Sequence, residues 1–357
     1  MERKWLSNYK FYPILTIMLL IFLWNACTKN TDSKIDDNKY FTFLNEYQIS
    51  KYSLLSGAIS FVPGKNEEFY FSNLFARRIY KTFPPFTKII PVGRRGRGPG
   101  EYLVPSRLYV YKNNLFFSDI KNGLIKSFGL NQDETNISNN SIYEISLSTG
   151  GGNKFVVDKK NVYVLDKGQH LLSIYAKKSG NLLYNVLEKN PIYGIPNRIL
   201  NGGGIVIDSQ GYLYTSSAAP YRIYKFITLA DTLKLISQWD LSALPGVISW
   251  DEQKNQKYQN IKEHEKKHEL LESITYVQNL FLIEDKVPYL IVHLCSKENE
   301  NLYHLLNIDG ELISSFFSTR HFLMGTRKNR LFFYDQKGLA ECDSCTVIKE
   351  YLFTNER

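Results

Sequence analysis

The sequence lacks the features of several common classes of protein. Its N-terminal apolar run, Ile14–Leu23, has ten residues, whereas a helix needs roughly 20 to span a bilayer, which argues against an ordinary transmembrane helix there. The glycine-rich stretch at 93–102 is followed by no Lys-Ser or Lys-Thr pair, which excludes a phosphate-binding P-loop. Only four cysteines are present, and no helical pattern follows the Cys-x-x-Cys stretch at 342–345, which argues against a thioredoxin-type redox role.

What the sequence does contain begins with an export signal. Three basic residues precede the apolar run, and Ala26 stands directly before Cys27. This order is typical of a signal peptide over residues 1–26, and the Ala-Cys pair resembles the lipobox of bacterial lipoproteins. We therefore expect lipidation of Cys27 with palmitate, a flexible tether over 27–39, and a lipid anchor in the outer membrane, on its periplasmic or cell-surface side. An uncleaved membrane anchor is the alternative.

Basic residues outnumber acidic ones, with 44 Lys and Arg against 35 Asp and Glu. Removal of residues 1–26 would take away three basic residues and one acidic residue, which leaves a net charge of +7 on the mature chain. Such a surface favours anionic partners such as acidic glycans, phosphate groups or lipid headgroups. Nucleic acid is not expected as a partner, because an exported protein rarely meets any.

A short strand pattern recurs six times along the chain. The copies begin at residues 69, 115, 162, 213, 289 and 331 and read FYFSN, LFFSD, VYVLD, LYTSS, YLIVH and LFFYD. Most are followed by a second strand and a turn, so that each unit is a meander of four strands in roughly 45 residues, the size of a propeller blade. The sequence therefore predicts an all-β fold, a six-bladed β-propeller of four-stranded antiparallel blades over 40–357.

Two irregularities in the repeat carry further predictions. The last copy ends too near the C-terminus to complete a blade, so residues 40–50 are predicted to close the ring as its outer strand. The gap between the fourth and fifth copies is about 30 residues longer than the others. It holds a run rich in Lys, Glu and Gln at about 249–273, which predicts a helical insertion between blades 4 and 5, with Ser249 and Glu252 as a capping box.

The stretch Gly-Arg-Arg-Gly-Arg-Gly-Pro-Gly-Glu-Tyr at 93–102 is similar to a motif of the six-bladed β-propeller lipoproteins of Bacteroidota, which are of the NHL-like type. In that family G-x-x-G-x-G-P-G-E-[YF] joins the first blade to the second. The resemblance implies the fold and export, and it supplies no catalytic residues. Taken by itself, the stretch is either a structural loop or a set of free N–H groups able to cradle an anion.

The loops between second and third strands lie on the same face of a propeller as the connections between blades. This places one set of cationic side chains together as a candidate ligand-binding face: Arg77, Arg78, Arg94, Arg95, Arg97, Lys121, His170 and Arg222. We expect a monomeric, non-catalytic binding or scaffold module for an anionic glycan or protein partner. The alternative is an enzyme resembling lactonases, lyases or hydrolases that acts on a small metabolite or glycan at the channel mouth.

Metal chemistry has weak support in the sequence. Asp119, Asp166 and Asp335 stand at equivalent positions of three blades and could hold calcium, although an Asp that closes a tight turn is the favoured interpretation. No cofactor is predicted otherwise. His264-Glu265-Lys266-Lys267-His268 matches the zinc-protease pattern H-E-x-x-H, but its charged surroundings favour a solvated helix. In an exported protein a disulfide between Cys342 and Cys345 is allowed.

Overall fold

The structure is a computed structural model, and it describes residue 35 and residues 38–50, 55, 58–98, 101–130, 143–147, 154–166, 169–200, 202–229, 232–296, 301–318, 321–335 and 345–355. Lys34–Arg357 forms one compact unit. The expected signal peptide, its cleavage site and Cys27 lie outside the described residues. In the described part of the chain, no helix is long and apolar enough to cross a membrane.

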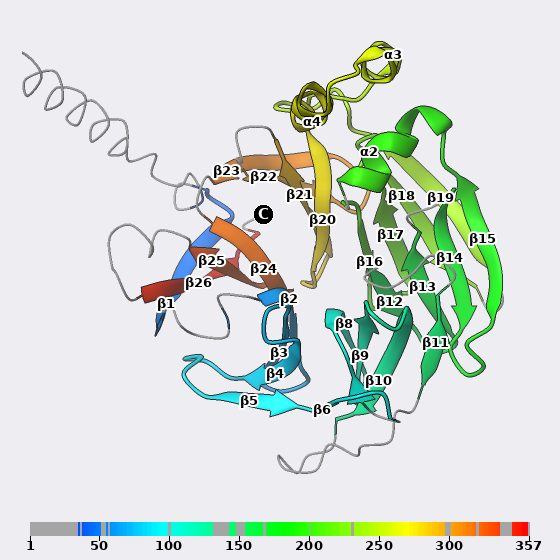
Figure 1. The fold of residues 1–357 in the computed structure, drawn as a ribbon. Coiled ribbons are helices and arrows are strands. Elements are labelled where there is room, and N and C mark those ends of the chain that lie inside the picture. Colours follow the sequence, from blue (N-terminus) through cyan, green and yellow to red (C-terminus); the bar gives the residue numbers. More distant parts are fainter. Residues whose placement is uncertain are drawn as a thin grey trace, which may run out of the picture. The chain divides into compact units, whose positions relative to one another are not determined.

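Six four-stranded antiparallel sheets form this unit, as the repeat predicts (Figure 1), and a two-stranded parallel sheet of β6 (Arg94–Arg95) and β7 (Glu101–Tyr102) lies in the connection between the first two. The innermost strands are β2 (Ala58–Pro63), β8 (Pro105–Tyr111), β12 (Phe155–Val157), β16 (Gly204–Ile207), β20 (Tyr276–Ile283) and β24 (His321–Arg327). The second strands are β3 (Phe69–Asn73), β9 (Asn114–Asp119), β13 (Asn161–Leu165), β17 (Tyr212–Ser216), β21 (Tyr289–Cys295) and β25 (Arg330–Asp335). The third are β4 (Arg78–Thr82), β10 (Leu124–Gly129), β14 (His170–Ala176), β18 (Arg222–Thr228), β22 (Asn301–Asn307) and β26 (Cys345–Phe353). The outer strands are β5 (Ile89–Val92), β11 (Glu144–Ser146), β15 (Leu182–Glu188), β19 (Leu233–Asp240), β23 (Leu312–Ser318) and β1 (Phe41–Ser50).

Each innermost strand contacts the innermost strands of the two neighbouring blades, so the six sheets form a closed ring. Aromatic and branched residues fill the spaces between the sheets. Between blades 6 and 1, for example, the ring centroids of Phe69 and Phe332 lie 4.7 Å apart in an edge-to-face contact, a favourable geometry for aromatic pairs. No single sheet could bury both of its faces, and ring closure provides the missing neighbour.

The N-terminal strand completes the last blade, which is the arrangement that the sequence predicts. β1 pairs antiparallel with β26 from Phe41 opposite Phe353 to Ser50 opposite Cys345, and Figure 1 shows the two strands side by side. A buried carboxylate reinforces the junction. Glu350 accepts hydrogen bonds from the Tyr47 hydroxyl at 2.6 Å and from the Asn45 amide at 2.9 Å.

The insertion between blades 4 and 5 is helical, but it forms two helices where the sequence predicts one. α3 spans Glu252–Asn260 and α4 spans His264–Glu272, with extended backbone between them. The predicted cap is wrong: Asp251 caps α3, and its carboxylate accepts the N–H of Lys254 at 2.8 Å. Neither helix has a broad apolar face, so packing does not favour one continuous helix.

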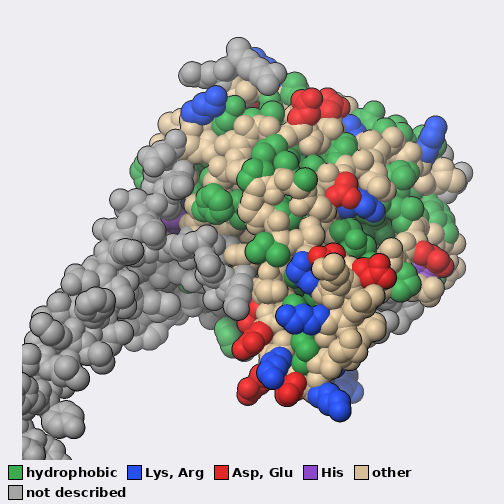
Figure 2. Space-filling model, turned by 90° about the horizontal axis from the view of Figure 1, so that it is seen from above, with side chains coloured by type: hydrophobic (Ala, Val, Ile, Leu, Met, Phe, Trp, Pro, Cys, Tyr) green, Lys and Arg blue, Asp and Glu red, His purple; other side chains and the backbone are tan. Residues whose placement is uncertain are grey.

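The insertion packs on a short helical connection between blades 3 and 4, η2 (Pro191–Tyr193) and α2 (Gly194–Ile199). Trp250 is fully buried in this small core together with Leu271, and its indole N–H donates to the Ile192 carbonyl at 2.9 Å. Trp250 therefore holds the insertion on the body of the propeller. Figure 2, seen from the side of α3 and α4, shows Lys and Arg side chains intermixed with Asp and Glu side chains.

Candidate functional site

Six of the eight cationic residues proposed for the ligand-binding face belong to blades 1 and 2. Arg77 and Arg78 lie at the turn between β3 and β4, Lys121 lies at the turn between β9 and β10, and the other three lie in the connection between the two blades. All six side chains are exposed, and none forms an ion pair with the part of the chain that the structure describes. We call this set the basic sector: Arg77, Arg78, Arg94, Arg95, Arg97 and Lys121.

The glycine-rich connection is filled by its own carboxylate and does not form an open anion cradle. The Gly98 N–H donates to Oε2 of Glu101 at 2.8 Å. A Cβ placed on Gly96 would lie 2.0 Å from the same oxygen, so glycine is required there for the carboxylate to enter the loop. Of the two interpretations of this stretch, the structural loop is therefore the one that fits these contacts.

Tyr102, the last residue of the motif, joins this connection to blade 1. Its hydroxyl donates to the Val92 carbonyl at 2.6 Å and accepts the Ile79 N–H at 3.2 Å, and the side chain is fully buried. Asp119 joins the same connection to blade 2, since it accepts the N–H groups of Leu103 and Val104 at 2.9 and 3.0 Å. These contacts hold the three segments of the basic sector against one another.

Apolar side chains accompany the basic sector at the tips of its two turns. Phe75 is 86% exposed, and Leu74 and Ile120 are 39% and 40% exposed. The Asn73 side-chain oxygen accepts the Ala76 N–H at 2.7 Å and fixes the turn that carries Leu74 and Phe75. Exposed apolar groups rimmed by charges are typical of interaction surfaces. Sequence reasoning missed these three residues, although Ile120 directly precedes Lys121, and Leu74 and Phe75 lie within three positions of Arg77, two basic residues that it did select.

The two remaining residues of the predicted face lie on other blades and have different surroundings. Arg222 pairs with Asp240 at 2.6 Å, and this carboxylate raises the pKa of the guanidinium. His170 is half-buried at the start of β14 in blade 3. Arg222 is therefore already neutralised, and within the predicted face the unpaired Arg and Lys side chains lie on blades 1 and 2.

The acidic residues considered for calcium act within their own turns. Besides its two backbone contacts, Asp119 accepts a hydrogen bond from the Asn122 amide at 2.7 Å, and Asp166 accepts one from Ser173 Oγ at 3.1 Å. Neither residue lines the central cavity, and the side chain of Asp335 lies outside the described residues. Across the described ranges, no group of three or more His, Cys, Asp or Glu is placed to hold a metal ion.

The zinc-protease pattern lies on the exposed surface of α4. His264 and His268 are both exposed, and His268 Nδ1 lies 3.0 Å from Oε1 of Glu272 in the same helix. Only Leu271 of this helix is buried. A catalytic zinc needs a shaped cavity that excludes water, which this helix does not provide.

One cysteine is described with its side chain. Cys295 is free and lies 3.7 Å from Nε2 of His293. Burial raises the pKa of the Cys295 thiol to about 11 and lowers the pKa of His293 to about 4, so both are neutral at pH 7 and suit a structural role. The predicted pair of Cys342 and Cys345 lies outside the side chains that the structure describes.

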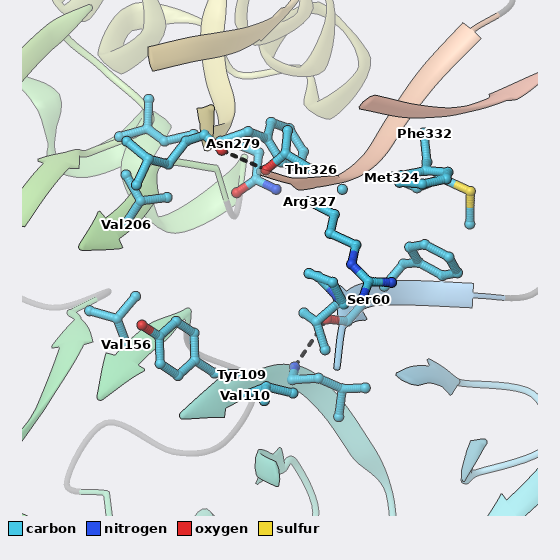
Figure 3. A pocket seen from close by; sticks show the side chains of 18 of the residues that line it. Ser60, Tyr109, Val110, Val156, Val206, Asn279, Met324, Thr326, Arg327 and Phe332 are labelled. Carbon is cyan, nitrogen blue, oxygen red and sulfur yellow. Dashed lines mark hydrogen bonds between the residues drawn. The ribbon is translucent and has the colours of Figure 1, made fainter. Parts of the chain in front are cut away.

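The innermost strands surround a central cavity of about 1500 Å³. Figure 3 shows Tyr109, Val156 and Val206 on one side of it, across from Thr326 and Arg327. No residue of the basic sector lines this cavity. Its lining includes the turns after β2, β12, β16 and β24, at 64–65, 158–159, 208–211 and 328–330, which lie on the face opposite the basic sector. The molecule thus offers two separate candidate sites.

The fold is similar to that of solved β-propellers. A Bacteroides fragilis protein described as exported superposes with a TM-score of 0.61 at 12% identity, over 91% of this chain and 98% of that chain. Virginiamycin B lyase of Staphylococcus aureus superposes with a TM-score of 0.49 at 10% identity, over 88% of this chain and 100% of that chain. BamB of Moraxella catarrhalis superposes with a TM-score of 0.41 at 9% identity, over 89% of this chain and 99% of that chain. No known family model and no curated protein matches the sequence. The similarity to the Bacteroides protein supports the six-bladed fold alone.

Proposed function

We propose that this protein is an exported binding protein that recognises an acidic glycan through its basic sector. The observation that carries the proposal is the distribution of charge around the loops of blades 1 and 2. Between Glu68 and Glu101 the chain has seven basic residues and no acidic one. Five of the seven are arginines of the basic sector, all exposed.

An anionic partner fits this surface because the carboxylates of the surface itself already accept hydrogen bonds from nearby backbone N–H groups. Glu101 is enclosed by the glycine-rich connection, and Asp119 is fully buried and bonded to backbone N–H groups. The five guanidinium groups therefore face solvent without local neutralisation. Guanidinium groups bind carboxylate and sulfate-like oxyanions with paired hydrogen bonds, which gives direction as well as charge.

A glycan is favoured over a small anion by the shape of the site. The basic sector is an exposed surface, not a cavity, and small molecules bind in concave sites. Phe75 offers a flat apolar ring on the same turn as Arg77, and aromatic rings of this kind bury large areas in recognition surfaces. An extended chain of charged sugars could contact Phe75 and several arginines together.

The test uses the chain from Lys34 to Arg357, which forms one compact unit containing all six sheets. Binding to immobilised heparin and polygalacturonate is measured by biolayer interferometry, with neutral dextran as the reference. We expect the acidic glycans to bind and the affinity to fall as salt rises. Arg94→Ala/Arg97→Ala is expected to weaken binding about tenfold or more, because hydrogen bonds to charged groups are lost.

The matched control is Lys257→Ala/Lys262→Ala, which removes the same charge from exposed positions of the insertion. We expect it to bind like the unmodified protein. Phe75→Ala should weaken glycan binding at unchanged net charge. Equal losses in the control and the arginine variant, or equal binding of dextran, would show that the basic sector is not a glycan site.

Export and lipid attachment belong to the same proposal, supported by the order of charge, apolar run, Ala26 and Cys27. Metabolic labelling with an alkyne analogue of palmitate tests the attachment in a bacterial host. We expect label in the unmodified protein and none in Cys27→Ala. Label that persists in the variant would contradict an anchor at this cysteine.

A further inference from the structure

The central cavity contains one arginine whose charge no other side chain of the described structure neutralises. Arg107 lies on β8, the innermost strand of blade 2, and lines the cavity. Its Nη1 donates to the Ile59 carbonyl of blade 1 at 3.0 Å. No carboxylate in the described part of the chain lies within ion-pair distance of it. The remaining N–H groups of its guanidinium are available to a ligand.

A β-bulge positions this side chain. Between Pro105 and Leu108 the register of β8 against β9 shifts, so that Ser106 and Arg107 both stand opposite Ser118. The Arg107 N–H donates to Ser118 Oγ at 3.1 Å, which satisfies the backbone group that the bulge leaves without a ladder partner. Bulges re-aim side chains and are frequent beside functional sites.

Three other cationic groups that line the cavity have partners, and Lys65, Lys159 and Lys328 are exposed on the turns at its mouth. Arg327 pairs with Glu67 at 3.3 Å, and its guanidinium lies over the ring of Phe69. Arg330 pairs with Glu350 at 2.9 Å. The Lys154 ammonium donates to the carbonyls of Gly203 and Gln278, on blades 4 and 5. Arg107 differs from these three because, among the described residues, a single backbone carbonyl is the only partner of its guanidinium.

The acidic groups of the lining do not compensate Arg107. Asp158 accepts the Tyr163 hydroxyl at 2.8 Å and backbone N–H groups of its own turn. Asp208 likewise accepts N–H groups of Gln210 and Tyr212 at 2.9 and 2.8 Å. Burial and the neighbouring Asp208 raise the pKa of Glu284.

Leaving a guanidinium charged and uncompensated inside a protein is costly, and burial lowers the pKa of Arg107. A ligand that brings one negative charge would remove this cost. A dianionic phosphate on Arg107 would instead leave one of its charges without a cation beside it, because Arg327, Arg330 and Lys154 are engaged and the remaining lysines of the lining are exposed on turns at the cavity mouth. A single carboxylate therefore matches the charge of the site.

The walls around Arg107 indicate what the rest of the ligand is like. Val110, Val156 and Val206 line the cavity on blades 2, 3 and 4, and Figure 3 shows them with Tyr109 around the channel. Apolar walls with few polar groups are typical of small-molecule sites. We propose that the central cavity binds a small organic monocarboxylate, with its carboxylate on Arg107 and its apolar body against the valines.

The experiment uses the chain from Lys34 to Arg357 and measures binding of hexanoate and benzoate by calorimetry and by thermal shift. Ligand at about 20 mM detects dissociation constants of millimolar order. We expect both carboxylates to bind, whereas inorganic phosphate and hexylamine should not. Arg107→Met is expected to weaken carboxylate binding about 10- to 100-fold, because a charge-assisted hydrogen bond is lost.

Two further measurements separate a ligand site from a structural arginine. Without ligand, Arg107→Met should melt no lower than the unmodified protein, because it removes an uncompensated charge. Arg327→Met, which changes a paired arginine of the same cavity, should change carboxylate binding less than Arg107→Met does. The inference is overturned if neither carboxylate binds, if phosphate binds more tightly than both, or if Arg107→Met melts lower and binds carboxylates unchanged.

This inference does not depend on the proposed glycan site. Arg94→Ala/Arg97→Ala should leave carboxylate binding unchanged, and Arg107→Met should leave binding to heparin unchanged. Failure of one proposal is therefore distinguishable from failure of the other.

Discussion

The hydroxyl of Tyr102 is expected to stabilise the junction between blades 1 and 2. It donates to the Val92 carbonyl at 2.6 Å and accepts the Ile79 N–H at 3.2 Å, inside a fully buried contact. Tyr102→Phe keeps the ring, which packs edge-to-face on Phe117 at 5.5 Å, and removes both hydrogen bonds. The substitution thus isolates the polar contribution of one atom to the connection that carries the basic sector.

The expected loss of stability follows from the Val92 carbonyl, which Tyr102→Phe leaves buried without its hydrogen-bond donor. A buried acceptor without a partner costs about 1–3 kcal/mol, and the 3.2 Å contact with Ile79 adds less. We expect a loss of about 2 kcal/mol in the free energy of unfolding. For a unit of this size, that loss lowers Tm by about 3 °C.

Urea denaturation followed by circular dichroism measures this loss, with Tyr80→Phe as the matched control. Tyr80 is also buried, on the adjacent strand β4, but its hydroxyl has no hydrogen-bond partner in the described part of the chain. We expect the control to stay within about 0.5 kcal/mol of the unmodified protein. If Tyr102→Phe and Tyr80→Phe have equal midpoints, the hydroxyl does not fasten the junction and our account of the motif is refuted.

Two further predictions concern the glycine-rich connection and the buried histidines. Gly96→Ala should lower the free energy of unfolding by about 1–2 kcal/mol, because the new Cβ expels the Glu101 carboxylate from the loop. Gly194→Ala is the control, since a Cβ at Gly194 meets nothing within 4 Å, and it should cause no measurable loss. Equal losses of the two variants in urea denaturation would contradict this prediction. Burial lowers the pKa of His293 and of His304 from 6.5 to about 4. As the pH falls, these histidines therefore take up protons in the unfolded chain before they do so in the folded chain. The free energy of unfolding should be highest above pH 6.5 and should decline between pH 6.5 and 4. The urea midpoint of His304→Phe should fall less over this range, and an equal fall would mean that His304 does not titrate on unfolding.

The number of blades could be predicted because the second strands carry a strong local signal. β3 and β13 are buried along their whole length between neighbouring sheets, so their sequences, FYFSN and NVYVL, are mostly apolar. Closure of the ring by residues 40–50 could be predicted by counting strands, since the sixth sheet has only three strands without them. The outer strands gave weaker signals, because β15 and β19 are largely exposed and mix polar with apolar residues.

The details of the sites could not be predicted from the sequence in the same way. The carboxylate that fills the glycine-rich connection comes from Glu101, within the motif, but only the folded loop shows that it points inward. Arg107 gave no signal in the sequence, because the role proposed for it depends on a bulge and on which carboxylates have other partners. The break between α3 and α4 gave no signal either, because no glycine or proline stands between them.

The two proposed sites lie on opposite faces because the blades are antiparallel. The basic sector is formed by turns between second and third strands and by the connection that enters β8, whereas the cavity opens among the turns that leave the innermost strands. Successive turns of an antiparallel meander alternate between faces. A glycan on blades 1 and 2 would therefore leave the cavity mouth free. Because salt screens exposed charges far more than buried ones, the arginines of the basic sector suit reversible attachment to a charged polymer. Arg107 suits selection of a single small anion.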